Sequence, residues 1–259
     1  MKIKLIGKRE NPAVVLIHGV FCDYKSVMHF AEYLQDDFFL VLPTLDGHYP
    51  DSKDYTTAAK QARILSVALR RMGIEKIAMI HGTSMGAAVA LEMAEVCDIP
   101  TDNYFFDAGT FFRLTGVYSN IMYKKFVILS HKFRNPNADE LMQKRFVRRL
   151  CGGNTENYSD TISSVINTLD FMTENTVKNV FNTCFNCRLP HFDNETAEKF
   201  IFHFSDKEPV HRCRKRLKKR YPSAHFSDYP GRDYCGFQTN EPELYAQFLK
   251  DIIDNCAEI

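Results

Sequence analysis

The chain has 259 residues, 45% of them hydrophobic and 25% charged, and its formal net charge at pH 7 is +1. A chain of this length buries one large core, and this composition excludes disordered, collagen-like and coiled-coil proteins. The small net charge gives no general electrostatic reason to bind nucleic acid or a membrane surface, and no run approaches the ~20 apolar residues of a membrane span.

The cysteines indicate a reducing environment. The sequence has eight of them, and residues 1–7 lack the apolar segment of a secretory signal peptide. Cysteines without such a signal predict reduced thiols rather than a disulfide framework, so we expect a cytoplasmic protein.

Short apolar runs alternate with longer amphipathic ones, which predicts an α/β fold with a mostly parallel sheet and helices on both faces. The expected strands are 2–7, 13–18, 38–42, 76–81, 104–107, 199–204 and 224–229. The expected helices of this core are 25–34, 56–72, 85–96, 210–220 and 242–255. Residues 110–197 break the alternation and predict helices at 114–130, 138–150, 158–173 and 175–185.

The first informative segment is the apolar run that begins at Ala13 and ends in His18-Gly19. Five consecutive apolar residues bounded by turn residues are typical of a buried strand in a parallel sheet. His18 stands where the strand ends, and we expect it to brace the following loop rather than to carry a proton.

The second segment is Gly82-Thr83-Ser84-Met85-Gly86, which lies between an expected strand and an expected helix. Strand, G-x-S-x-G and helix are the context of a nucleophile elbow, a turn so tight that only glycine fits two residues either side of the serine. In this architecture the Met85 amide is one oxyanion donor, and the loop after the earlier strand supplies the other, here the amide of Val20 or of Phe21.

These features resemble the α/β-hydrolase superfamily, most nearly its small single-domain bacterial members. The resemblance covers nearly the whole chain and rests on His18-Gly19, on the elbow and on the order of the elements. It implies hydrolysis of a carboxylic ester or related acyl bond through an acyl-enzyme on Ser84, without a metal or cofactor. It also implies that residues 110–197 form a helical cap inserted between two core segments, 1–109 and 198–259.

The cap sequence is rich in phenylalanine and tyrosine, which predicts a mostly apolar pocket. We therefore expect a small-molecule substrate or ligand with an apolar acyl or alcohol part. We expect neither nucleic acid nor a membrane as a partner.

The resemblance also implies an acidic residue after the strand at 199–204. Its usual register places the acid on Glu208, with Asp206 as the near alternative and Asp107, at the end of the preceding strand, as a third. Each of these carboxylates has an ordinary alternative role as a solvated turn residue or a helix N-cap.

The histidine of the expected triad is missing. The turn after the last strand spans residues 229–237 and contains no histidine, and Tyr234 stands at the histidine position. Tyrosine has an ordinary pKa near ~10 and is poorly matched to act as a base at neutral pH.

Three explanations of this departure stay open. Another histidine serves as the base, and His48, His211 and His225 are the candidates. Alternatively, Tyr234 or a water supports slow turnover, since an oxyanion hole retains residual catalysis without a full triad. The third is a catalytically impaired protein that keeps the fold and binds a small ligand or a partner.

One charge run needs an interpretation. Residues 212–220 hold seven lysines or arginines, but Val210, Cys213 and Leu217 recur at helical spacing beside them. This pattern predicts the solvated face of an amphipathic helix rather than a nucleic-acid site.

Overall fold

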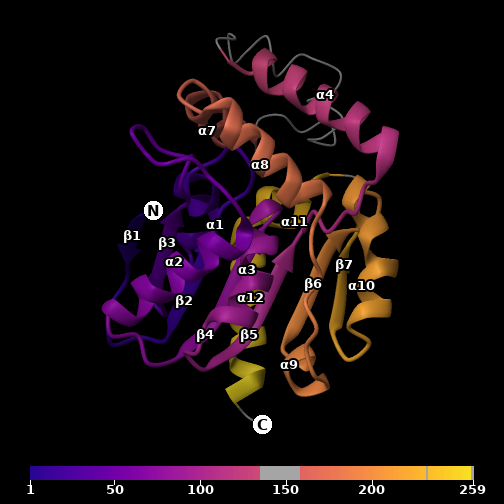
Figure 1. The fold of residues 1–259 in the computed structure, drawn as a ribbon. Coiled ribbons are helices and arrows are strands. Elements are labelled where there is room, and N and C mark those ends of the chain that lie inside the picture. Colours follow the sequence, from indigo (N-terminus) through magenta and orange to yellow (C-terminus); the bar gives the residue numbers. More distant parts are fainter. Residues whose placement is uncertain (135–157, 232, 258–259) are drawn as a thin grey trace.

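A computed structural model describes residues 1–134, 158–231 and 233–257, and a seven-stranded sheet runs through it (Figure 1). The strands are β1 (Lys2–Ile6), β2 (Ala13–Ile17), β3 (Phe39–Thr44), β4 (Ile77–Thr83), β5 (Thr101–Asp107), β6 (Phe200–Ser205) and β7 (His225–Tyr229). Their order is β1-β3-β2-β4-β5-β6-β7, and β1 alone is antiparallel to its neighbour. The predicted strands and the mostly parallel sheet are confirmed.

The helices of the core agree with the sequence pattern in place, though not always in length. The α-helices of the described chain are α1 (Met28–Ala31), α2 (Ala58–Arg71), α3 (Met85–Val96), α4 (Gly116–Lys132), α7 (Ser159–Leu169), α8 (Glu174–Phe185), α9 (Asn194–Glu198), α10 (Arg214–Arg220), α11 (Gly236–Asn240) and α12 (Pro242–Ala257). Two expected helices begin as 3₁₀ turns, η1 (Tyr24–Val27) before α1 and η3 (Pro209–Cys213) before α10. The short helices α9 and α11 were not expected.

Strand β2 shows why the sheet is covered on both faces. All five of its residues are buried, and they alternate between two cores. Val15 and Ile17 belong to a buried cluster with residues of α2 and α3, whereas Val14 and Leu16 belong to a second cluster with residues of α1 and α12. A strand that is apolar on both sides therefore requires helices on both faces of the sheet.

Helices α4, α7 and α8 lie beyond one edge of the sheet, at the end where β4 leads into the elbow (Figure 1). Helix α8 packs against α4 and against α3, and α7 packs against η1. After α8 the chain runs back along the sheet to α9, beside the start of β6. The helix expected at 138–150 lies outside the described residues, and the division into a core (1–109 and 198–259) and an inserted cap (110–197) stays a prediction.

Two further expectations concern the chain as a whole. Within the described residues, no helix is long and apolar enough to cross a membrane. The six cysteines whose side chains are described are free, as expected of reduced thiols: Cys22, Cys97, Cys184, Cys187, Cys213 and Cys235.

Candidate active site

Ser84 lies at the junction of β4 and α3 with a strained backbone. Its φ is +56° and its ψ is −114°, a conformation that residues with a side chain rarely adopt. A Cβ added at Gly82 would lie 2.4 Å from the carbonyl oxygen of Gly86, and one at Gly86 would lie 2.4 Å from that of Ile17. Both glycines are therefore required by close backbone approach, as the elbow motif predicts.

The two expected oxyanion donors lie beside this serine. A Cβ at Gly19 would stand 3.4 Å from Ser84 Cβ, so the loop after β2 passes directly over the serine. Met85 is the first residue of α3, where an N–H has no acceptor within the helix. Within the described chain, the backbone N–H groups of Val20 and Met85 form no hydrogen bond. Both amides are thus available to a bound oxygen atom.

Tyr234 contacts the serine directly. Its hydroxyl donates to Ser84 Oγ at 2.6 Å and lies 3.3 Å from the carbonyl oxygen of Ala108. Tyr234 is half-buried as a residue, but its hydroxyl is enclosed, and burial raises its pKa well above the usual 10. The phenol is therefore neutral near pH 7 and acts as a hydrogen-bond donor.

The alternative histidines lie elsewhere. His48 is buried with its Nδ1 3.0 Å from the carbonyl oxygen of Asp46, and burial lowers its pKa to about 3. His211 pairs with Asp228 at 3.4 Å, and His225 is exposed at the start of β7. The hydrogen bond described for the Ser84 hydroxyl is with Tyr234 and not with a histidine.

His18 braces its loop, as expected. Its Nδ1 lies 2.8 Å from the carbonyl oxygen of Gly19, and its Nε2 accepts the Leu45 amide at 3.1 Å. Since Nε2 accepts, Nδ1 holds the proton and donates to Gly19. Burial lowers the His18 pKa to about 4, so the ring stays neutral and joins the loops after β2 and β3.

Glu208 supports the loop that holds Tyr234. It is 3% exposed, and its carboxyl oxygens accept the backbone N–H groups of Ser205 at 3.1 Å and of Cys235 at 3.4 Å. Burial, with a smaller contribution from the charge of Asp107, raises the pKa of Glu208 to about 9. Glu208 is therefore a neutral acid at pH 7, and its described hydrogen bonds do not include the Tyr234 hydroxyl.

The other two candidate acids have different surroundings. Asp206 is exposed and accepts the Gly231 amide at 3.0 Å, which closes the turn beside β7. Asp107 is buried at the end of β5 and accepts from Gln238 Nε2 and, at 3.0 Å, from the Tyr245 hydroxyl. Burial raises its pKa despite these donors.

The Asp107 network was missed from the sequence. The Tyr245 hydroxyl also lies 2.7 Å from His81 Nε2, so the network joins β4, β5 and α12 beneath the elbow. Its donors come from the C-terminal helices, more than a hundred residues along the chain. The available signal was a charged residue, Asp107, directly after the apolar run Tyr104-Phe105-Phe106, because a buried carboxyl group needs hydrogen-bond donors.

Helix α7 touches both loops that flank Ser84. The Tyr158 hydroxyl, just before α7, donates to the carbonyl oxygen of Tyr234 at 2.7 Å. Ser164, within α7, accepts the Asp23 amide at 3.2 Å and donates to the Asp23 carboxylate at 3.0 Å. The position of α7 is thus fixed by the segment after β2 on one side and, on the other, by the loop that holds Tyr234, here called the tyrosine loop.

Comparison with known proteins identifies the fold. No family model and no curated protein matches the sequence. A Desulfitobacterium hafniense protein assigned to the α/β-hydrolase family is 21% identical, with a TM-score of 0.69 over 97% of this chain and 100% of its own. A Nitrososphaera gargenis carboxylesterase gives a TM-score of 0.75 at 13% identity, covering 99% of this chain and 95% of its own. MenH from S. aureus gives 0.74 at 12% identity, covering 98% of each chain. The chain therefore has the α/β-hydrolase fold.

Proposed function

We propose that this protein is a serine hydrolase that cleaves a carboxylic ester or related acyl bond through an acyl-enzyme on Ser84. The observation that supports this most directly is the strained Ser84 backbone beside the Val20 and Met85 amides, for which no partner is found in the part of the chain that the structure describes. Such strain persists only where the surrounding structure enforces it, and it clusters at active sites. Solved structures with the same fold include esterases, among them a thermophilic esterase from Thermogutta terrifontis at 15% identity.

In the proposed reaction, Ser84 Oγ attacks the carbonyl carbon of the ester. The carbonyl oxygen becomes an oxyanion that accepts hydrogen bonds from the Val20 and Met85 amides. The Tyr234 phenolate takes the Ser84 proton as the new C–O bond forms and passes it to the alcohol oxygen as the bond to the alcohol breaks. Water then adds to the acyl carbon and gives a proton to Tyr234, which returns it to Ser84 Oγ as the acid departs.

The slow step in this proposal is removal of the proton from the Ser84 hydroxyl. Tyr234 is the group within reach, but it accepts a proton only as phenolate, and its raised pKa leaves almost no phenolate near pH 7. We therefore propose slow acylation that accelerates as pH rises. Glu208, in this proposal, is a positioning residue for the tyrosine loop.

The proposed substrate has an apolar group. The Phe21 ring, in the loop after β2 that also holds Val20, lies 5.1 Å from the Phe126 ring of α4. The Phe126 ring in turn lies 5.5 Å from the Phe181 ring of α8. Aromatic side chains thus join the loop that holds Val20 and Phe21 to helices α4 and α8, and on this basis we propose an ester with an apolar acyl or alcohol part.

A second candidate is ligand binding without turnover. It is favoured by one observation, the Tyr234 hydroxyl donating to Ser84 Oγ at 2.6 Å where a base would need to accept. In this alternative the serine, the tyrosine and the two amides hold a carbonyl or carboxylate ligand without forming a covalent bond.

Labelling with a fluorophosphonate probe, together with hydrolysis of a short aryl ester, tests the proposal. We expect slow labelling that reaches one probe per chain, and slow ester hydrolysis, with both lost in Ser84→Ala. A folded wild-type protein that neither takes up the probe nor hydrolyses the ester would reject the hydrolase and leave the binding function.

A further inference from the structure

We propose that a basic groove beside α10 binds a small molecule that carries phosphate groups. The groove has a volume of about 650 Å³. None of the described lining residues carries a carboxylate. Five cationic side chains line the groove: Arg113, Arg188, Arg216, Lys219 and Arg220. The site is independent of the proposed hydrolase function.

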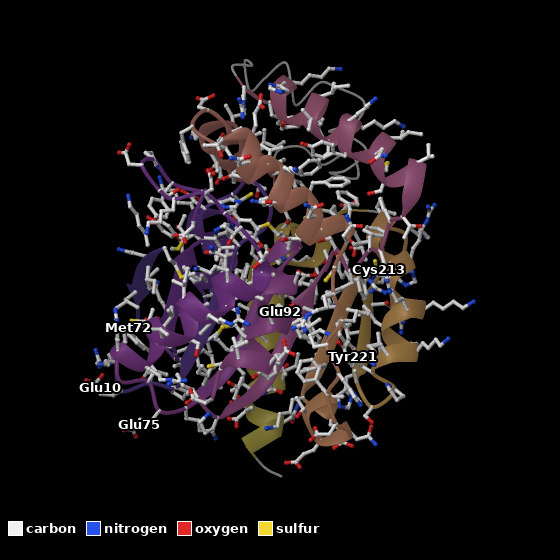
Figure 2. All side chains as sticks on the ribbon, in the orientation of Figure 1. Glu10, Met72, Glu75, Glu92, Cys213 and Tyr221 are labelled. Atoms are coloured by element: carbon white, nitrogen blue, oxygen red, sulfur yellow. The ribbon has the colours of Figure 1, made fainter. Side chains whose placement is uncertain are left out.

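The groove forms where the two connections to helices α4 and α8 meet the core. Arg113 lies before α4 and pairs with Asn186, after α8, in an antiparallel bridge. The Cys187 amide also donates to the carbonyl oxygen of Phe112 at 2.9 Å, so the two connections run side by side. Helix α10 lies against them on the α3 face of the sheet, with Cys213 and Tyr221 beside its ends (Figure 2).

Hydrogen bonds to carbonyl groups orient two of the arginines without neutralising them. Arg216 donates to the carbonyl oxygens of Phe111 at 2.7 Å and of Cys187 at 3.0 Å. Arg220 donates through Nε to the carbonyl oxygen of Pro190 at 3.0 Å. Each guanidinium group keeps its charge and further N–H donors, and is already ordered.

The groove has more positive charge than its described counter-charges balance. Arg188 pairs with Glu92 at 2.9 Å and with Glu95, and it is the one lining cation with an ion pair among the described residues. The other four cations remain at close quarters. Like charges gathered in one concave surface repel each other, and a bound anion relieves that repulsion.

Helix α10 keeps its other basic residues away from this groove. Arg214 pairs with Asp228, and Lys218 lies 5.2 Å above the Phe226 ring. The basic residues of α10, predicted from the sequence to form one solvated face, therefore lie on two sides of the helix. Those on one side contact β7, and those on the other side line the groove, where no described residue carries a carboxylate.

Phosphate is the anion that fits this donor set best. Planar guanidinium groups match pairs of phosphate oxygens, and several cations suit a ligand with two or more negative charges. The volume lies in the range of small-molecule sites. A single-stranded nucleic acid would also need aromatic faces for its bases, and the described lining has none.

Calorimetric titration of the full chain with inorganic pyrophosphate tests this site. The test variant is the Arg113→Gln/Lys219→Gln double variant, since both side chains are exposed and no hydrogen bond is described for either. The matched control is Lys215→Gln/Lys218→Gln, which removes two charges from the same helix region outside the groove lining. We expect one site per chain, binding weakened about tenfold or more in the test variant, and less than about twofold weakening in the control.

Any of three results would overturn the proposal. One is the absence of saturable pyrophosphate binding by the folded wild-type chain at about 0.1 M salt, where diffuse surface attraction is screened. Another is equal weakening in the two double variants, which would indicate a diffuse basic surface. Tighter binding of a single-stranded oligonucleotide, weakened equally in both, would lead to the same rejection.

Discussion

The two sides of the candidate site differ in how well they meet the demands of acyl transfer. On the serine side, the elbow and the loop after β2 hold a strained Ser84, two close-packed glycines and the Val20 and Met85 amides, which form no hydrogen bond among the described residues. On the tyrosine side, burial raises the pKa of both the Tyr234 hydroxyl and the Glu208 carboxyl, so neither group is an ionised base near pH 7.

This difference separates two requirements of nucleophilic catalysis. Positioning of Ser84 comes from backbone geometry, which the sheet and α3 enforce. Activation needs a group that accepts a proton near pH 7, and the tyrosine loop offers none. The hydrolase that we propose would therefore have a positioned serine without its usual base.

The largest expected effect comes from a substitution that disrupts the backbone packing of the elbow. Gly82→Ala places a Cβ 2.4 Å from a backbone oxygen, so we expect a loss of more than about 4 kcal/mol of stability, or no folded protein. Gly116→Ala is the matched control. It has a φ of +60° and open space, so it should cost only about 1–2 kcal/mol. Thermal unfolding of both variants measures the contrast, and similar losses would show that the elbow is not close-packed.

Supplying a base on the tyrosine side should raise activity. Tyr234→His places a group with an ordinary pKa of ~6.5 next to Ser84, so hydrolysis of a short aryl ester at pH 7.5 should be faster than in the wild type. A general base contributes at most about 10⁴-fold, which bounds the gain. Tyr234→Phe, which keeps the ring, is the control and should not accelerate the reaction. An equal gain in both variants would mean that Tyr234 merely blocks the site.

The protonated state of Glu208 should appear in the pH dependence of stability. Its pKa is about 9 in the folded chain, above its ordinary 4.5, so the folded state holds a proton that the unfolded state has lost. This contribution to the free energy of unfolding is present below about pH 4.5 and falls between there and pH 9, by at most about 1.4 kcal/mol per pH unit.

Urea unfolding at several pH values checks this linkage. Glu208→Gln should unfold with a flatter pH dependence than the wild type, because glutamine does not titrate. Asp206→Asn, at an exposed turn carboxylate, is the control and should leave the wild-type slope unchanged. A wild-type slope retained in Glu208→Gln would show that Glu208 is ionised in the folded protein.

The smallest expected effect concerns the contact between α7 and the tyrosine loop. Tyr158→Phe removes the hydrogen bond to the Tyr234 carbonyl oxygen and should cost about 1 kcal/mol, a Tm decrease of about 2–4 °C. Tyr118→Phe, at a tyrosine that is 60% exposed on α4, is the control and should not change the Tm. Equal melting temperatures for all three proteins would show that α7 is not held there.

The sequence predicted those parts of the site that depend on close backbone approach at glycines and on the spacing of apolar residues along strands and helices. Glycines at 82 and 86, with an apolar strand before them and a helix after them, suffice to predict an elbow, and the missing histidine drew attention to Tyr234. The Asp107 network was not predictable in this way, because its donors approach from α11 and α12. The basic groove was missed for the same reason, since Arg113, Arg188 and α10 meet only in the folded chain.

Short helices were also missed. Helix α11 follows Cys235, whose φ is +55°. The local sequence gives no reason to expect this left-handed conformation at a cysteine. The Glu208 carboxyl accepts the Cys235 amide, so a long-range contact supports this bend. The raised pKa of Glu208 likewise depends on burial, which a loop sequence of charged residues does not indicate.

The pH dependence of Ser84 labelling by a fluorophosphonate probe tests most directly whether the serine is positioned but not activated. We expect the second-order rate, corrected for Ser84→Ala, to rise continuously from about pH 5 to pH 10, because Tyr234 ionises only above that range. A rate that levels off near pH 7, with a midpoint close to the ordinary histidine pKa of ~6.5, would contradict the account. It would mean that a histidine activates Ser84 in solution.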